Sequence, residues 1–189
     1  MQKSGLLFPA MDILGETVPK GWKRTWAFGR SFWAAKKNGF LRPCRETVPL
    51  ADVPDETFAK EILGKGIAIR PASGSVCAPC AGRVDMVFET GHAITLTADN
   101  GAEILVHVGL DTVNLKGKYF HVHAKAGQRV AKGDLLLEFD REAIAGAGYD
   151  TVTQVIICNS DRYVNITALT GRTVALGDPI LELGREVRT

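Results

Sequence analysis

Two of the four histidines of this chain, His92 and His107, flank a turn motif in the stretch GHAITLTADNGAEILVHVGLDTV. The ADNGA segment between two β-patterned runs predicts a hairpin, because Asn-Gly supplies the positive φ values that tight turns require. A two-residue turn at Asn100 and Gly101 would place the two rings diagonally on one face, and a turn at Asp99 and Asn100 would place them directly opposite each other. A three-residue turn would instead send them to opposite faces. We expect an even turn and therefore a histidine pair.

Two imidazoles on one face can carry out phosphoryl transfer without a metal ion. A neutral ring nitrogen is a good nucleophile near pH 7, and a second imidazole can donate a hydrogen bond to the charge that develops on a phosphoryl group. Thr90 would share the strand face of His92, and Asp111 follows His107. Because protonation removes the lone pair of the nucleophile, phosphoryl acceptance should weaken below the ordinary histidine pKa of about 6.5. The pair could also bind zinc, although a catalytic zinc normally needs a third protein ligand.

The elements that must position this pair are predicted to be β-strands. From about residue 46, short β-patterned runs alternate with Gly, Pro and Asn, which indicates an all-β antiparallel sandwich or barrel-like fold. Ile104, Val106 and Val108 alternate with His107 and are expected to face the core. Two helical candidates, near residues 54–63 and 141–148, are too short to form a layer. The predicted strand runs are 66–76, 82–90, 92–101, 102–109 and 153–161.

Residues 126–139 and 170–183 form an internal repeat. Their sequences, AGQRVAKGDLLLEF and TGRTVALGDPILEL, share their glycine, valine, Gly-Asp and Leu-Glu positions. Two copies of one strand, turn and strand unit predict pseudo-symmetry in the sheet. We interpret the repeat as architecture, because neither copy contains the lysine turn of a biotinyl or lipoyl carrier.

Composition restricts the class of protein. A chain of 189 residues that is 46% hydrophobic is long enough for one compact domain with a sizeable core. No run approaches the roughly 18 apolar residues that a membrane-spanning helix needs, and we read the four cysteines as thiols because no secretory signal is evident. Cys77 and Cys80 form a lone CxxC pair, for which we favour a structural interpretation.

The start of the chain differs from the rest in charge. Residues 1–45 carry nine Lys or Arg against two acidic residues, a net charge of +7, whereas residues 46–189 carry fourteen against nineteen, a net charge of −5. On a helix, Trp22, Trp26 and Trp33 would form one stripe, which is typical of contact with an anionic membrane surface. An extension or linker with incidental aromatic residues fits equally well.

These motifs resemble, in order and spacing, the glucose-type enzyme IIA component or domain of the bacterial phosphoenolpyruvate-dependent sugar phosphotransferase system. The likeness extends over roughly residues 46–184 and is carried by FETGHAI, GAEILVHVGLDTVNLKG, GQRVAKGDLLLEFD and VIICN. It implies that residues 45–189 form the IIA phosphocarrier domain, with a β-sandwich fold. Residues 1–44 are then a basic, Trp-rich N-terminal extension or linker.

The resemblance implies a role for each member of the pair. His107 corresponds to the histidine that accepts a phosphoryl group from the histidine-containing phosphocarrier protein and passes it to a IIB domain of a sugar permease during sugar uptake. His92 corresponds to the histidine that stabilises the phosphoryl group, and Thr90 to the hydroxyl that orients the hydrogen bonds. This phosphotransferase chemistry requires no cofactor, although adventitious or regulatory zinc at the two histidines would suit the ligands.

The resemblance also implies how partners dock. Acidic positions would meet arginines of the donor, and an apolar ring around the histidines would receive two partners in turn. A cytoplasmic protein is expected, with peripheral membrane contact through residues 1–44 as an option and no nucleic-acid partner. The matching positions are Asp55 and Asp111 for the acidic pair and Phe58, Phe88, Leu105 and Val113 for the apolar ring.

Three positions depart from the family pattern. They are Arg45, Lys65 and Gln154, the last of which stands where a proline often follows the threonine. We expect none of them to touch the histidine pair.

Two other classes of function remain open. The first is a non-catalytic regulator that binds transporters or metabolic enzymes through the apolar patch. The second is a zinc peptidase of the LytM type, whose patterns are present as His107-x3-Asp111 and His121-x-His123. The two patterns lie only ten residues apart here, whereas those peptidases separate them widely, so we regard this alternative as remote.

Overall fold

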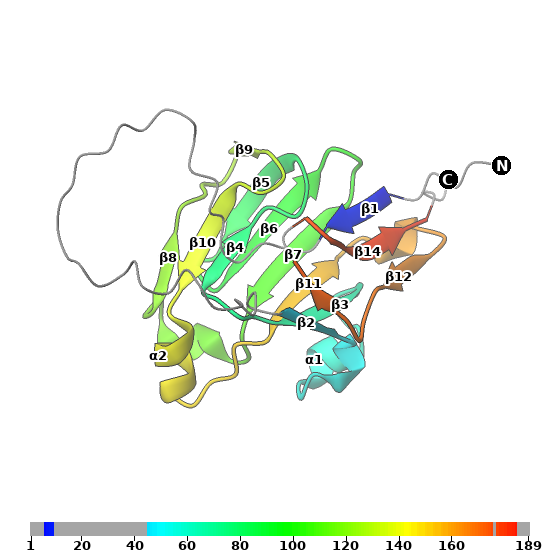
Figure 1. Ribbon diagram of the computed structural model, residues 1–189. Helices are drawn as coiled ribbons and strands as arrows, with labels where there is room; N and C mark the ends of the chain where they lie inside the picture. Colours follow the sequence, from blue (N-terminus) through cyan, green and yellow to red (C-terminus); the bar gives the residue numbers. More distant parts are fainter. Residues whose placement is uncertain (1–5, 10–44, 176, 185–189) are drawn as a thin grey trace, which may run out of the picture.

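The part of the chain that the structure describes forms three antiparallel β-sheets whose side chains meet in a main hydrophobic core (Figure 1). The computed structural model describes residues 6–9, 45–175 and 177–184. The largest sheet has eight strands in the order β13-β2-β3-β11-β7-β6-β5-β9, and the two smaller sheets have the orders β4-β10-β8 and β1-β14-β12. Within the described residues only two short α-helices occur. The all-β prediction is therefore confirmed.

The strands are short and separated by turns. Those of the large sheet are β13 (Thr173–Val174), β2 (Arg45–Val48), β3 (Lys65–Arg70), β11 (Thr153–Ile157), β7 (Glu103–Val108), β6 (Ala93–Ala98), β5 (Gly82–Val87) and β9 (Arg129–Val130). Those of the small sheets are β4 (Ser75–Cys77), β10 (Leu135–Phe139), β8 (Phe120–Val122), β1 (Leu6–Pro9), β14 (Pro179–Leu183) and β12 (Ile166–Ala168). The five predicted strand runs all contain strands, and the structure adds others before, between and after them.

Alternation along the central strands separates the two faces of the large sheet. Ile104, Val106 and Val108 of β7 are at most 1% exposed and belong to the main core, as predicted. Val155 and Ile157 of β11 point into the same core. Because successive side chains of a strand point to opposite sides, the residues between them form the outer face.

A second, smaller hydrophobic cluster covers part of that outer face. The 3-10 helix η1 (Leu50–Asp52) and helix α1 (Glu56–Ala59) bring Leu50 and Phe58 over Leu105 of β7 and Ile156 of β11. Helix α1 begins at Asp55, whose Oδ1 accepts the backbone N–H groups of Thr57 and Phe58 at 2.8 and 3.2 Å. It is shorter than the predicted 54–63 segment.

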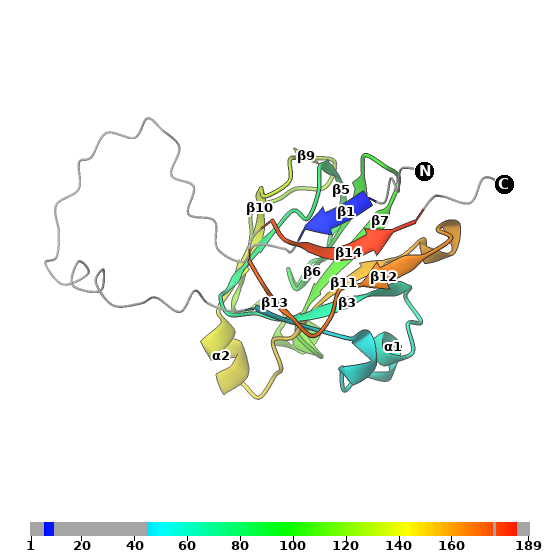
Figure 2. The same cartoon turned by 45° about the vertical axis from the view of Figure 1, so that its right-hand side comes forward.

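Helix α2 (Arg141–Gly146) confirms the second helical prediction. Its N-cap is Asp140, whose carboxylate accepts the backbone N–H of Ala143 at 2.9 Å. Both helices lie at the same end of the sandwich, α1 beside β2 and β3 and α2 below β8 and β10 (Figure 2).

The hairpin between β6 and β7 differs from the prediction. Ala93 pairs with His107 and Ala98 N–H donates to Ala102 O at 2.8 Å, so three residues form the turn. Both two-residue alternatives are therefore wrong. A strand continued from Ala93 would point His92 to the core face, but His92 precedes β6 and lies in the turn after β5, where the alternation rule does not apply.

The internal repeat is architectural. Each copy folds as a two-residue strand, a turn and a five-residue strand, β9 and β10 in one and β13 and β14 in the other. The matched aspartates act identically, since Asp134 accepts Ala131 N–H at 2.8 Å and Asp178 accepts Ala175 N–H at 2.7 Å. The repeat thus supplies equivalent turns in different sheets.

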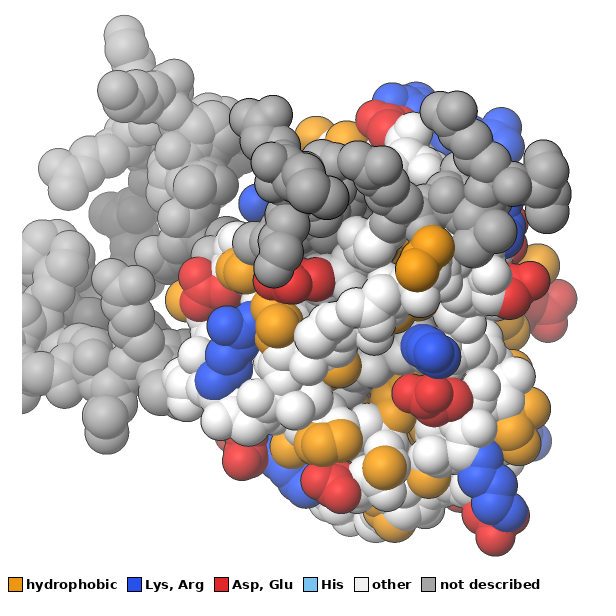
Figure 3. All heavy atoms as spheres, turned by 90° about the vertical axis from the view of Figure 1, so that its right-hand side faces the viewer, with side chains coloured by type: hydrophobic (Ala, Val, Ile, Leu, Met, Phe, Trp, Pro, Cys, Tyr) orange, Lys and Arg blue, Asp and Glu red, His pale blue; other side chains and the backbone are white. Residues whose placement is uncertain are grey.

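Part of the N-terminal segment belongs to the fold. Strand β1 pairs with β14, with Leu6 opposite Leu183. The tryptophan stripe lies outside the described residues, and the boundary at residue 45 stays a prediction. The described residues include no helix with the length and hydropathy needed to span a membrane. On the side of β12 and β14, acidic, basic and hydrophobic side chains are interspersed (Figure 3).

The tight spacing of β3 and β11 gives a stability prediction. A Cβ atom on Gly66 would lie 2.2 Å from the backbone oxygen of Val155, whereas one on Gly146 of α2 meets no atom within 4 Å. Gly66→Ala should therefore lower the free energy of unfolding by about 1–3 kcal/mol. Gly146→Ala, the matched control, should leave it unchanged or raise it by up to about 1 kcal/mol. Urea unfolding measures both, and equal midpoints for the two variants would contradict the close strand packing.

Candidate functional site

His107 projects from the outer face of a central strand. It lies on β7, flanked by Ala93 of β6 and by Gln154 of β11 in the strand register. The neighbouring residues Val106 and Val108 are fully buried in the core, so the backbone at this position is held on both sides. The imidazole itself is half-buried at the edge of the second hydrophobic cluster.

The Nδ1 atom of His107 faces two acceptors. The carbonyl oxygen of Gly109 lies 3.0 Å away and the Oε1 atom of Gln154 lies 3.2 Å away. Since neither oxygen can donate, Nδ1 carries the proton and Nε2 holds the lone pair. Within the described residues, Nε2 has no hydrogen-bond partner, which leaves it available as a nucleophile.

The loop after β7 aims the Gly109 carbonyl at the ring. Gly109 has φ +80°, and an added Cβ would lie 2.4 Å from Thr112 Cγ2 and 2.6 Å from Asp150 O. The buried Thr112 hydroxyl donates to Val108 O at 2.5 Å and fixes the loop to the strand end. A side chain at position 109 would therefore disturb the hydrogen bond that orients His107.

His92 reaches the site from the turn that follows β5. Its backbone carbonyl accepts Val108 N–H at 2.8 Å, and the preceding Gly91 has φ +66°. The Thr90 hydroxyl lies 2.5 Å from Nδ1 of His92, so the predicted contact between these two residues exists, although neither is on a strand. His92 is 5% exposed.

The two imidazoles meet edge to face. Their ring centroids are 4.8 Å apart and their planes are inclined by 85°. Phe58 packs against His107 at 5.1 Å and Phe88 against His92 at 5.6 Å between ring centroids. The predicted histidine pair is therefore present, held between two phenyl rings.

Burial keeps both histidines neutral. Burial, and then repulsion by His107, lower the pKa of His92 from 6.5 to about 4. Burial also lowers the pKa of His107, against the opposing effects of the hydrogen bonds to Gln154 and Gly109 and of the carboxylates Asp55 and Asp111. Neutral imidazole is the form that can act as a nucleophile, so the site is poised for it at pH 7.

The predicted partner-binding residues divide into supporting and exposed positions. Phe58 and Leu105 are 6% and 8% exposed and belong to the second hydrophobic cluster, whereas Phe88 and Val113 are 38% and 48% exposed. Asp111 is exposed and adopts a left-handed conformation, with φ 55°, and Asp55 is half-buried at the start of α1. Docking by these residues stays a prediction.

Gln154 is the site residue that the sequence interpretation missed. The expectation that it does not touch the histidine pair is wrong, because its amide oxygen lies 3.2 Å from His107 Nδ1. The contact joins residues 47 positions apart, and only the register of β11 against β7 creates it. The substitution of a polar residue for the usual proline was the one signal available in the sequence.

The geometry gives no support to the zinc peptidase alternative. His121 and His123 lie on and beside β8, in a different sheet from His107. Their rings are 4.6 Å apart, and His123 Nε2 lies 2.7 Å from Glu138 Oε2. Across the described parts of the chain, no group of three or more His, Cys, Asp or Glu side chains is arranged to hold a metal ion.

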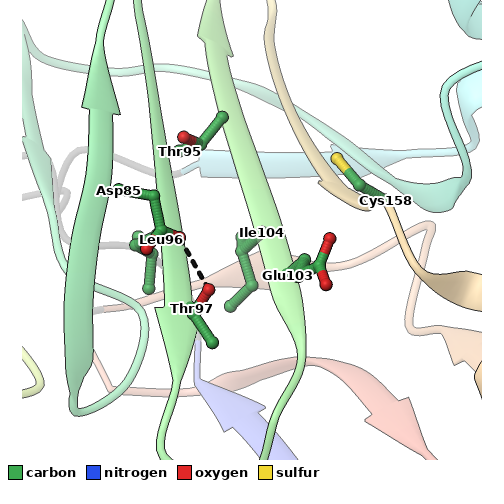
Figure 4. A pocket seen from close by; sticks show the side chains of 7 residues that line it. All are labelled: Asp85, Thr95, Leu96, Thr97, Glu103, Ile104 and Cys158. Carbon is green, nitrogen blue, oxygen red and sulfur yellow. Dashed lines mark hydrogen bonds between the residues drawn. The ribbon is translucent and has the colours of Figure 1, made fainter.

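The pocket at the other end of β6 and β7 is separate from the histidine pair. It has a volume of about 310 Å³, and its lining includes Thr95, Thr97, Glu103 and Cys158 (Figure 4). The Thr97 hydroxyl donates to the carboxylate of Asp85 at 2.6 Å. The pocket contains neither histidine, so the candidate site is the shallow surface around His92 and His107.

The sequence of the chain is similar to those of known proteins. The chain is 50% identical over 118 residues to the β-glucoside-specific EIIBCA component of the sugar phosphotransferase system of Bacillus subtilis (strain 168), a match that covers 62% of this chain and 19% of that protein. It is 47% identical over 116 residues to the glucose-specific EIIA component of Oceanobacillus iheyensis, covering 61% of this chain and 70% of that protein. The chain thus spans about a fifth of the length of the β-glucoside relative.

A solved structure has the same fold. The glucose permease IIA from Mycoplasma capricolum superposes with a TM-score of 0.68 at 33% identity, over 74% of this chain and 91% of that one. The profile of the family described as phosphoenolpyruvate-dependent sugar phosphotransferase system, EIIA 1, matches residues 43–163. These findings confirm the resemblance. The chain belongs to the EIIA family of the phosphoenolpyruvate-dependent sugar phosphotransferase system.

Proposed function

We propose that this protein is a phosphoryl carrier that accepts the phosphoryl group on Nε2 of His107 and then passes it on. The observation that carries the proposal is the pair of acceptors that lie 3.0 and 3.2 Å from His107 Nδ1. The imidazole of His92 lies beside this ring, with 4.8 Å between the two ring centroids. A ring that must keep its proton on Nδ1 exposes a basic nitrogen at Nε2. The second ring lies where it can contact a group attached there.

The transfer step is a direct displacement. The Nε2 lone pair of His107 forms the bond to phosphorus as the bond between phosphorus and the nitrogen of the donor imidazole breaks, and that electron pair returns to the donor ring. The Nδ1 proton stays on His107, so no other reactant takes part. Because such a transition state is loose, catalysis depends on positioning and on stabilising the charge of the phosphoryl oxygens.

His92 supplies that charge stabilisation. The Thr90 hydroxyl oxygen lies 2.5 Å from His92 Nδ1. When this hydroxyl donates to Nδ1, the proton of the neutral ring lies on Nε2. The Nε2–H group then donates to a phosphoryl oxygen. The short distance between the rings, 4.8 Å between centroids, supports this role, because it places His92 next to a group that His107 carries.

The partners follow from the family. We propose the histidine-containing phosphocarrier protein as donor and a IIB domain as recipient. The Bacillus subtilis relative is an EIIBCA component, a name that joins B, C and A components, which supports a IIB domain as the next carrier. Phe88 packs on His92, Asp111 acts on His107, and Val113 follows in the same loop as Asp111, so exposed apolar and acidic side chains are available to a partner.

Other expectations are not tested by these findings. The regulatory binding role, zinc at His92 and His107, a cytoplasmic location and membrane contact through residues 1–44 all stay predictions. No observation on the described residues favours the regulatory role or zinc binding over phosphoryl transfer.

Substitution of each histidine separates acceptance of the phosphoryl group from its transfer to the next protein. After incubation with phosphoenolpyruvate, enzyme I and the phosphocarrier protein, the wild type should gain one acid-labile phosphoryl group, detected by intact mass. His107→Gln should gain none. His92→Gln should still be phosphorylated but should pass the group to a IIB domain about 10²-fold more slowly, since one donor to the phosphoryl oxygens is lost.

Exposed histidines provide the matched controls for this experiment. His121→Gln and His123→Gln change histidines outside the site and should be phosphorylated like the wild type. An adduct that persists in His107→Gln, or one that disappears in His121→Gln, would refute the assignment of the acceptor.

The pH dependence follows from the lowered pKa values. The sequence alone predicts that acceptance weakens below about pH 6.5, but burial moves this window downward for both histidines. His92 should titrate near pH 4 and His107 below 6.5 in the folded protein. Titration of the ring protons by NMR measures both values. A His107 that titrates at or above 6.5 would contradict the buried, neutral nucleophile.

The same shifts predict an effect on stability. Between the unfolded value of about 6.5 and the folded values, the unfolded chain binds more protons than the folded one, so protonation favours unfolding. The contribution of His92 is therefore fully present above pH 6.5 and is lost as the pH falls to about 4. Urea unfolding measures this effect: as the pH falls from about 6.5 to about 4, the free energy of unfolding should fall less for His92→Gln than for the wild type. Identical pH profiles would contradict the shift.

A further inference from the structure

Gln154 occupies a position from which it can act on the nucleophile. It is the β11 partner of His107 in the strand register and is fully buried. It lies on the outer face of the sheet, in line with Ile156, while Val155 points to the core. A polar side chain buried at such a place requires partners for both ends of its amide.

The amide orientation is fixed by its two contacts. Nε2 of Gln154 donates to the carbonyl oxygen of Val152 at 3.0 Å, and Oε1 lies 3.2 Å from His107 Nδ1. If the amide were turned over, its oxygen would face the Val152 oxygen, and two acceptors would repel each other. Oε1 is therefore the atom presented to His107.

We propose that Gln154 is a positioning residue that, together with the Gly109 carbonyl, holds the proton of His107 on Nδ1 and so leaves Nε2 as the nucleophile. The proposal rests on the proposed function of His107 and deepens it. The Gly109 carbonyl comes from the loop after β7, whereas Gln154 comes from the neighbouring central strand β11. Two acceptors from independent elements fix both the tautomer and the plane of the imidazole.

The hydrogen bond between Gln154 and His107 Nδ1 should be stronger when His107 carries a phosphoryl group. As the Nε2–P bond forms, the ring that still holds its Nδ1 proton gains positive charge, and hydrogen bonds from a charged donor are stronger than those from a neutral one. The other groups that face His107 are Asp55 and Asp111, whose carboxylates favour the same positive charge, and the neutral ring of His92. Gln154 thus favours acceptance of the phosphoryl group over its return to the donor.

Removal of the amide should leave the fold intact. Val152 O also accepts Gly109 N–H at 2.9 Å, and His107 Nδ1 keeps the Gly109 carbonyl at 3.0 Å. Gln154→Met therefore leaves no polar atom without a partner and preserves the length of the side chain. Ile156→Val is the matched control, since it alters an apolar side chain on the same face of the same strand and changes no hydrogen bond to a histidine.

The first readout needs no phosphoryl transfer. In ¹⁵N NMR of His107, the wild type and Ile156→Val should show the proton on Nδ1. Gln154→Met should show a mixture of tautomers and a lower pKa, because one hydrogen bond that raises the pKa is lost. Gln154→Glu should restore the Nδ1–H tautomer and raise the pKa above that of the wild type. If the buried glutamate prevents folding, the comparison of Gln154→Met with Ile156→Val decides alone.

The second readout is the rate of phosphorylation by the phosphocarrier protein. Gln154→Met should lower kcat about 3- to 10-fold, the value of one hydrogen bond, with little change in KM for the donor. The proposal is overturned if Gln154→Met matches Ile156→Val in tautomer, pKa and kcat. If the wild type accepts no phosphoryl group, the proposed function fails, but the NMR comparison still decides whether Gln154 sets the tautomer.

Discussion

The register of β6, β7 and β11 is the constraint on which the site depends. It places His107 on the outer face of a strand whose alternate residues fill the core, so the backbone cannot shift without emptying that core. The same register sets Gln154 beside the ring, and the strand end brings the Gly109 carbonyl to the same nitrogen. A rigid sheet thus fixes one side of the imidazole and leaves the other side open.

Helix α1 links this sheet to the surface where a partner would dock. The Asp55 carboxylate starts the helix by accepting two backbone N–H groups, and its charge also acts on His107. Phe58 of the same helix packs on the ring at 5.1 Å and helps to bury it. Burial lowers the pKa of His107, whereas the Asp55 carboxylate raises it. Helix α1 and its N-cap residue therefore contribute to both opposing effects on this pKa.

Local patterns were enough to predict the fold class, the core face of β7 and the paired turns of the repeat. They were not enough to predict how the histidines meet. The Asn-Gly signal located the hairpin but not its length, and the three-residue turn breaks the even register on which the predicted pairing relied. The rings still meet because Gly91, with φ +66°, turns the chain before β6 begins. Gln154 was missed because the pairing of β11 with β7 is a long-range contact that no local pattern encodes.

The surroundings of the two histidines support the roles proposed for them. Nδ1 of His107 faces two oxygens that can only accept, so its tautomer is fixed and its Nε2 atom must hold a lone pair. Nδ1 of His92 faces a hydroxyl, which can either donate or accept. A nucleophile needs an invariant lone pair, whereas a group that stabilises a phosphoryl oxygen must present a proton when the charge arrives. The fixed ring therefore suits attack on phosphorus, and the adaptable ring suits stabilisation of the transferred group.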